Sequence, residues 1–153
     1  GGMVGLMGIC ADATLKEGGT VVGVIPRFLD DQEVGHRGLT ELHVVRTMHE
    51  RKQMMAERAD LFIALPGGIG TMEELFEVWT WRQLGYHDQP IGLLNVEGYY
   101  DAFLHLCSQM VAEGFLAAEP LSALVTDDEP ERLLLELAAR ARRARGPEDY
   151  SRI

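Results

Sequence analysis

The chain is poor in cysteine and has no long apolar run. Its two cysteines, Cys10 and Cys107, lie far apart in 153 residues and share no spacing typical of a metal or redox site. We therefore expect reduced thiols and a cytoplasmic protein. The longest apolar stretches, such as 61–66 and 91–96, are far shorter than the ~18 residues that a membrane-spanning helix requires. No basic start followed by an apolar run indicates a signal peptide, so we expect no membrane partner.

Basic residues are too few to balance the acids. Asp and Glu together number 24 against 14 Lys and Arg, which gives a formal net charge of −10. A chain of this charge repels a phosphate backbone, so we expect no nucleic-acid partner, and any anionic ligand must be held by a local site. The five histidines show no paired ligand spacing, so we expect no metal.

What the chain does contain is an alternation of apolar strands and helices. The patterns predict strands over 20–25, 41–45, 60–65, 90–96 and, at a sheet edge, 121–125. They predict helices over 5–17, 48–59, 71–84, 99–113 and 129–145, with a long loop over 27–40 and a polar tail over 146–153. Continuous apolar strands separated by helices are typical of the α/β class, with a doubly wound parallel sheet covered on both faces. We expect one such domain over 1–145.

The first residues form a glycine turn that leads into a helix with no strand before it. In α/β folds such a turn normally follows a strand, which delivers it to the ligand edge of the sheet. We therefore expect that the first β-α-β unit is missing from this chain, although Gly1 and Gly2 as a cloning scar would give the same pattern.

The strongest local signal is the segment 66–71, Pro-Gly-Gly-Ile-Gly-Thr, between a predicted strand and a predicted helix. Glycines let the backbone approach a ligand closely, and a helix that begins near Thr71 presents unpaired N–H groups to an anion. The segment therefore favours a phosphate site made from backbone, while a tight turn without ligand explains the same residues. It lacks the lysine of a Walker loop and the full dinucleotide fingerprint.

Glu74 has two interpretations. Residues 71–74 read T-x-x-E, so Thr71 can cap the helix with Glu74 as its capping-box partner. Alternatively, a carboxylate in the first helical turn, stabilised as the anion, opposes positive charge on a sugar carbon close to a bound phosphate.

Arg51 lies on the helix predicted over 48–59 without an acidic residue three or four positions away. It either extends to solvent along a row of methionines or directs its guanidinium to an anion. Lys52 shares this lack of acidic neighbours and fits a solvated position.

Other residues that stand out have ordinary explanations beside functional ones. His36 and Arg37 lie in the predicted loop and either contact substrate or are solvated. Trp79 and Trp81 suit the core, a dimer interface over 78–84, or a base pocket.

Together these motifs carry a resemblance to a known family. Residues 1–8, GGMVGLMG, resemble the family's GGGxxGLMG segment, and Glu50-Arg51-Lys52 followed by PGGIGTMEE at 66–74 resembles its PGGxGTxxE signature. The chain is identified as a member of the Lonely Guy (LOG) family of cytokinin riboside 5′-monophosphate phosphoribohydrolases. Many members carry an older label, possible lysine decarboxylase.

The resemblance implies a Rossmann-like fold, usually a homodimer, that uses no cofactor. It implies hydrolysis of the N-glycosidic bond of N6-substituted AMP to a free cytokinin base and ribose 5-phosphate. Arg51 and Glu74 would be the catalytic pair. The substrate and its phosphate would be held by Gly1, Gly2, Lys52, Gly67, Gly68, Gly70 and Thr71.

Three other functions are weighed against this one. A pyridoxal-dependent lysine decarboxylase needs a Schiff-base lysine, and neither Lys16 nor Lys52 lies in a supporting cofactor motif. A nucleotide-binding module without catalysis could use the same phosphate site. A broader nucleoside-monophosphate N-glycosidase would differ at the base pocket.

Overall fold

The computed structural model describes residues 2–31 and 35–144, which form two compact units, Gly1–Arg58 and Ala59–Ile153. We call them the N-terminal and the C-terminal unit and describe each by itself. The tail predicted over 146–153 lies outside the described residues. Among the described helices, none is long and apolar enough to cross a membrane.

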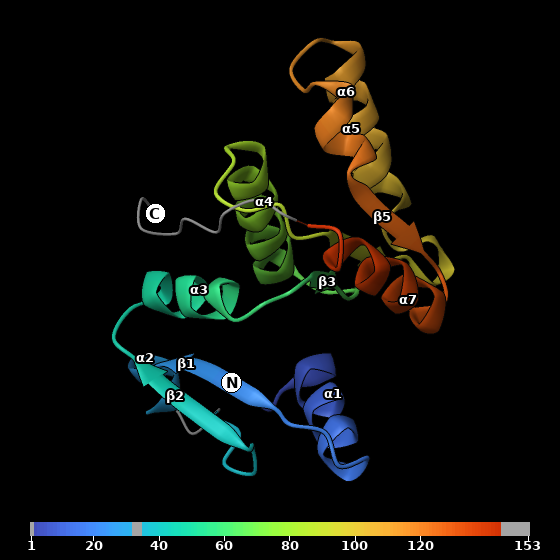
Figure 1. Ribbon diagram of the computed structural model, residues 1–153. Helices are drawn as coiled ribbons and strands as arrows, with labels where there is room; N and C mark the ends of the chain where they lie inside the picture. The colour runs from blue at the N-terminus through green and yellow to red at the C-terminus, as the bar shows by residue number, and fades with distance from the viewer. Residues whose placement is uncertain (1, 32–34, 145–153) are drawn as a thin grey trace. The chain divides into compact units, whose positions relative to one another are not determined.

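The described part of the N-terminal unit, 2–31 and 35–58, contains two parallel strands and three helices (Figure 1). In chain order these are α1 (Gly5–Lys16), β1 (Val22–Pro26), α2 (Arg27–Asp30), β2 (Glu41–Val45) and α3 (Met48–Glu57). Strand β1 pairs with β2 from Val22↔Glu41 to Pro26↔Val45, and both α2 and α3 pack on this pair. The first turn of the loop predicted over 27–40 is thus helical, because α2 follows Pro26 directly.

The C-terminal unit contains a three-stranded parallel sheet in the order β3-β4-β5. Its elements are β3 (Phe62–Ala64), α4 (Ile69–Gln83), β4 (Ile91–Leu94), a 3₁₀ turn η1 (Val96–Gly98), α5 (Asp101–Ala112), α6 (Ala118–Ser122), β5 (Leu124–Asp127) and α7 (Pro130–Ala141). Strand β5 lies at an edge of this sheet, as predicted, but it begins three residues later than expected because 118–122 form α6.

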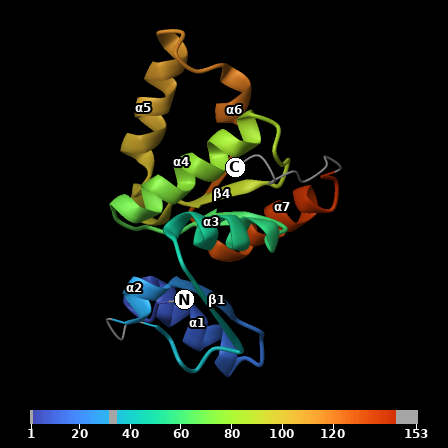
Figure 2. The same ribbon diagram turned by 90° about the vertical axis from the view of Figure 1, so that its left-hand side faces the viewer.

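Helices cover both faces of this sheet (Figure 2). On one face, Ile91 and Leu93 pack in a core with residues of α4 and α5. On the other face Gly92 meets α7, where an added Cβ would lie 2.5 Å from Leu137 Cδ1 and 3.0 Å from Leu133 Cδ1. The alternation of a β-strand places these two sets on opposite sides. The α/β class with parallel strands is confirmed, with the strands in two small sheets flanked by helices and consistent with a Rossmann-like fold.

Both tryptophans of α4 are buried. Trp79 and Trp81 are each 6% exposed. The indole Nε1–H of Trp79 donates to the Pro120 carbonyl at 3.0 Å, and its ring packs beside Phe76 and Phe103. The assignment of the two side chains to the core is therefore confirmed, while a dimer interface over 78–84, where Leu84 is 61% exposed, stays a prediction.

Candidate functional site

Helix α4 begins within the glycine-rich turn and not after it. Strand β3 ends at Ala64, and Gly68 is the N-cap of α4 with extended backbone angles (φ −84°, ψ −159°). The first helical hydrogen bond runs from Met72 N–H to the Gly68 carbonyl at 3.2 Å. The helix thus starts two residues before the predicted Thr71. The N–H groups of residues 68–71 have no acceptor within the helix and point out of its end.

Thr71 does not cap α4, so the capping-box interpretation is wrong. It is the third helical residue, and the N-cap Gly68 has no side chain to accept a hydrogen bond. Its side chain packs against the turn instead, because a Cβ added to Gly67 would lie 2.2 Å from Thr71 Oγ1. Glycine is therefore required at position 67 by this close approach.

Glu74 lies in the second turn of α4, since the first turn contains no acid. The stabilisation by the helix dipole that was expected of a first-turn carboxylate is thus weaker here, because that effect fades beyond the first turn. Glu74 is half-buried, and it follows Gly70 and Thr71 by four and three residues, which places it on their side of the helix. Residues three and four apart are neighbours on a helix surface, so Glu74 lies one turn further along α4 than the N–H groups of Gly70 and Thr71.

The N-terminal end of α4 is exposed to solvent. Gly68 and Gly70 are exposed, and nothing lies within 4 Å of the position that a Cβ would take at either residue. Ile69 between them is 91% exposed. The backbone at the start of α4 is therefore exposed to solvent at Gly68, Ile69 and Gly70.

Two tyrosines that the sequence analysis did not single out bind the backbone of this turn through their hydroxyl groups. The hydroxyl of Tyr99 donates to the carbonyl of Gly67, and that of Tyr100 donates to the carbonyl of Leu65 at 2.6 Å. They follow β4 and η1, so neighbouring strands of the sheet bring the two segments together. The two consecutive tyrosines that follow Gly98 were the feature of the sequence that could have indicated this contact.

The N-terminal unit carries Arg51 and Lys52 on α3, where both are half-buried. Arg51 Nη1 lies 3.6 Å from Met48 Sδ, in keeping with the predicted row of methionines. Arg51 and Lys52 belong to one unit and Glu74 to the other, and their shared role stays a prediction.

A second T-x-x-E pattern, which the sequence analysis missed, caps α3. Thr47 is the N-cap, and its hydroxyl accepts the Glu50 N–H at 3.1 Å. Glu50 accepts the Arg46 backbone N–H at 2.8 Å and pairs with the Arg46 guanidinium at 2.6 Å. These hydrogen bonds, first of all that from the guanidinium, hold the pKa of Glu50 below its usual value and raise that of Arg46. The cap fixes where α3 begins and hence where Arg51 lies on it.

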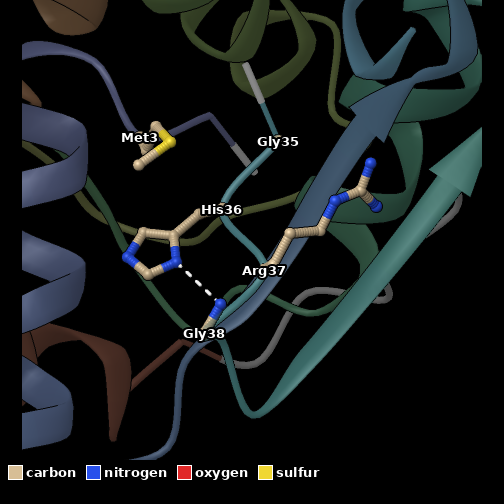
Figure 3. Close-up of a pocket in the computed structure, with 5 residues that line it drawn as sticks. All are labelled: Met3, Gly35, His36, Arg37 and Gly38. Carbon is tan, nitrogen blue, oxygen red and sulfur yellow. Dashed lines mark hydrogen bonds between the residues drawn. The ribbon is translucent and has the colours of Figure 1, made fainter. Parts of the chain in front are cut away.

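Gly2 pairs with the predicted loop, and residues of this loop line a pocket in the N-terminal unit. Gly2 forms an antiparallel bridge with Gly35, whereas Gly1 lies outside the described residues. A pocket of about 490 Å³ is lined by Met3, Gly35, His36, Arg37 and Gly38 (Figure 3).

Both side chains singled out in this loop are paired. Gly38 N–H donates to Nδ1 of His36 at 3.1 Å, so Nε2 carries the proton that it donates to Asp12 at 2.8 Å. The His36 side chain is 12% exposed, so it is no solvated loop residue. Arg37, 66% exposed, pairs with Asp30 at 2.7 Å.

The C-terminal unit thus brings together Gly67, Gly68, Gly70, Thr71 and Glu74, while Gly2, Arg51 and Lys52 lie in the N-terminal unit. Residues 7–137 match the family described as "Possible lysine decarboxylase". The chain belongs to this family. The resemblance drawn from the motifs is therefore confirmed.

Relatives with curated names are about half identical to this chain over the aligned residues. The cytokinin riboside 5′-monophosphate phosphoribohydrolase of Rhodococcoides fascians is 53% identical over 82% of this chain and 64% of its own length. The enzyme of that name called LOG in Oryza sativa subsp. japonica is 48% identical over 90% of this chain and 57% of its own length. LOG1 of Arabidopsis thaliana is 46% identical over 90% of this chain and 64% of its own length. The chain thus spans about six-tenths of the length of these relatives.

Proposed function

We propose that this protein hydrolyses the N-glycosidic bond of N6-substituted AMP, releasing the free base and ribose 5-phosphate. The observation that carries the proposal is the open start of α4, with free N–H groups at Gly68 and Gly70 and the Glu74 carboxylate one turn below. The names of the relatives, at 46–53% identity, agree with this chemistry.

The phosphate site follows from the backbone of the turn. The N–H groups of residues 68–71 and the positive end of the α4 dipole attract an anion even in a chain of net charge −10. Thr71 lies beside Gly67 and offers a hydroxyl to the same phosphate. Binding of the unreactive phosphate then positions the ribose for reaction.

Glu74 supplies the charge that the reaction needs. Cleavage of an N-glycosidic bond builds oxocarbenium-like positive charge on the ribose while the bond electrons leave with the base. A carboxylate on the side of the helix that carries Gly70 and Thr71 stabilises this charge or traps the sugar carbon before water attacks. Arg51 is proposed as the second catalytic residue, to orient the nucleotide or to interact with the leaving purine, and Gly2 and Lys52 as substrate-binding residues.

The first prediction concerns Glu74. Incubation with N6-isopentenyl-AMP should release isopentenyladenine, and Glu74→Gln should lower the rate at least a hundredfold while nucleotide binding persists, because the amide keeps the shape and loses the charge. Chromatography of the released base measures the first effect, and calorimetric titration with AMP measures the second. Glu73→Gln, at the exposed neighbouring position, is the matched control and should retain activity.

The same assay separates the other candidates. Binding of AMP with no release of base by the wild-type protein would support a non-catalytic module and contradict the proposal. Equal release of adenine from AMP would support a broader N-glycosidase. Cadaverine formed from lysine would support the decarboxylase label.

We also propose that the protein is a homodimer in a reducing compartment, the cytoplasm. Both Cys10 and Cys107 are free thiols. Exposed apolar side chains gather on α1 and just before it, where Val4, Leu6 and Ile9 are 46–70% exposed, and such patches often mark contact surfaces. Light scattering should give twice the 17.0 kDa of one chain, and the mass of a single chain would contradict the dimer.

A further inference from the structure

Two consecutive tyrosines donate hydrogen bonds to the backbone on either side of Pro66. Tyr99 donates to the Gly67 carbonyl, and Tyr100 donates to the Leu65 carbonyl at 2.6 Å. These are the last carbonyl before the proline and the first after it. Pro66 has no N–H of its own to anchor this part of the turn. The tyrosines therefore supply side-chain hydrogen bonds that hold the chain between β3 and α4.

The tyrosines are themselves fixed by a hydrogen-bonded network. The Asn95 side chain accepts the Tyr100 backbone N–H at 2.6 Å and donates to Asp101 at 2.9 Å, and the Asn95 backbone N–H donates to the Asp127 carbonyl at 2.8 Å. Thus the loop after β4 is tied to the end of β5. Glu97 (φ +52°) and Gly98 (φ +73°) turn the chain immediately before the tyrosines.

The two phenol rings also support each other. They meet edge to face, with centroids 5.1 Å apart at 86°. Tyr100 is completely buried, whereas Tyr99 is 48% exposed. Burial, with a smaller contribution from the neighbouring Tyr99, raises the pKa of the Tyr100 phenol, so this hydroxyl remains a donor at neutral pH.

The hydrogen bond from Tyr99 to the Gly67 carbonyl also affects the direction of the Gly68 N–H. The described residues contain no cis peptide bond, and in a planar trans peptide the C=O of one residue and the N–H of the next point in opposite directions. With the Gly67 carbonyl directed at Tyr99, the Gly68 N–H points away from Tyr99. Gly68 is exposed and is the N-cap of α4.

We infer that Tyr99 and Tyr100 are positioning residues for the phosphate turn, with Tyr99 orienting the Gly68 N–H toward the 5′-phosphate of the nucleotide. The inference rests on the proposed function, because it takes the phosphate site from there. Tyr99 acts through the Gly67–Gly68 peptide. Its hydroxyl is therefore needed for phosphate affinity and contributes little to the chemical step.

Tyr99→Phe tests this role, because it removes only the hydroxyl at a half-exposed position. Ribose 5-phosphate is titrated into the ¹⁵N-labelled protein, and the shifts of the Gly68 and Gly70 amides give its dissociation constant. We expect the constant to rise about tenfold, the effect of one lost hydrogen bond that aligns a charge-binding donor. With N6-isopentenyl-AMP as substrate, KM should rise by the same factor while kcat stays within twofold, as for an interaction made equally before and in the transition state.

Tyr86→Phe is the matched control, since Tyr86 lies beyond the other end of α4. It loses the same hydroxyl and should keep the wild-type constants. If Tyr99 only stabilised the fold, Tyr99→Phe would lower the unfolding midpoint and leave the dissociation constant for ribose 5-phosphate unchanged. This constant is measured from the amide signals of the folded protein, so a loss of stability does not alter it.

The outcomes distinguish the inference from the proposed function. An unchanged dissociation constant in Tyr99→Phe, with the wild-type protein binding ribose 5-phosphate, overturns the inference and leaves the proposed function standing. Wild-type binding without release of base overturns the proposed hydrolysis, and a tenfold weaker constant in the variant still supports the positioning role. Absence of ribose 5-phosphate binding by the wild-type protein overturns the inference together with the phosphate site on which it rests, while release of base alone decides the hydrolysis.

Discussion

Gly67 has no room for a side chain, and this shapes the whole turn. A Cβ added at residue 67 would lie 2.2 Å from the Thr71 hydroxyl oxygen and 2.9 Å from the Thr71 Cβ, both closer than atoms can pack. Gly70 differs, because nothing lies within 4 Å of its missing Cβ. Two glycines of one motif thus serve different purposes, since one allows close packing and the other leaves the ligand side open.

Replacement of the two glycines by alanine should separate these purposes. Gly67→Ala should lower the free energy of unfolding by about 1–3 kcal/mol, because Thr71 or the turn must move. Gly70→Ala should leave it unchanged or raise it by up to about 1 kcal/mol, because alanine is the better helix residue. Urea denaturation of both variants measures the difference. Equal losses of stability would show that the close approach at Gly67 is not what requires glycine there.

At the scale of elements, two identical patterns behave differently. Both Thr47–Glu50 and Thr71–Glu74 read T-x-x-E, but only the first caps a helix. The glycines at 68 and 70 let α4 start before Thr71. The three residues before Thr47 contain no glycine, and α3 starts at Met48, directly after Thr47. Glu50 and Glu74 therefore differ in their place on the helix: Glu50 completes the cap of α3, whereas Glu74 lies in the second turn of α4 and belongs to no cap.

Loss of the α3 cap should be measurable. Thr47→Ala should cost about 1 kcal/mol, because the Glu50 N–H loses its acceptor. Amide hydrogen exchange at Glu50 and Arg51 should accelerate accordingly. Thr71→Ala is the control, because its hydroxyl caps no helix. A comparable acceleration in the first turn of α4 in that control would contradict the difference between the two patterns.

At the scale of the whole molecule, a buried histidine and two paired acids make stability depend on pH. His87 is 3% exposed, packs beside Phe62 and donates from Nε2 to the Val78 carbonyl at 2.9 Å. Burial is the main cause that lowers its pKa. The pKa of Asp127 is lowered as well, first of all by the hydrogen bond from Arg132.

The His87 effect predicts a loss of stability in mild acid. A base whose pKa is lower in the folded state binds fewer protons there, so the free energy of unfolding falls as pH drops below the unfolded value of about 6.5. Urea midpoints at pH 7.5 and 5.5 measure this loss. His87→Gln, which keeps a donor in reach of Val78, should reduce it, while His105→Gln at an exposed position should not. The same loss in His87→Gln and the wild-type protein would contradict the assignment.

The Asp127 and Glu50 effects act at lower pH and have the same direction. An acid whose pKa is lower in the folded state contributes stability above its unfolded value and loses it as pH falls through the folded value, here below about 4. The His87 effect therefore begins at a higher pH than the effects of the two acids.

Local patterns were sufficient for the order of the strands and of the longer helices, for the parallel sheet of the C-terminal unit and for the family, but they did not predict the short helices α2 and α6. Apolar periodicity and glycine turns act over a few residues, and the spacing of the PGGIGTMEE motif is a property of the chain alone. The burial of Trp79 and Trp81, the start of α4 at Ile69 and the grip of Tyr99 and Tyr100 on the turn were decided by the tertiary structure. The tyrosines lie more than 30 residues from the carbonyls that they bind, and only the pairing of β3 with β4 brings them together.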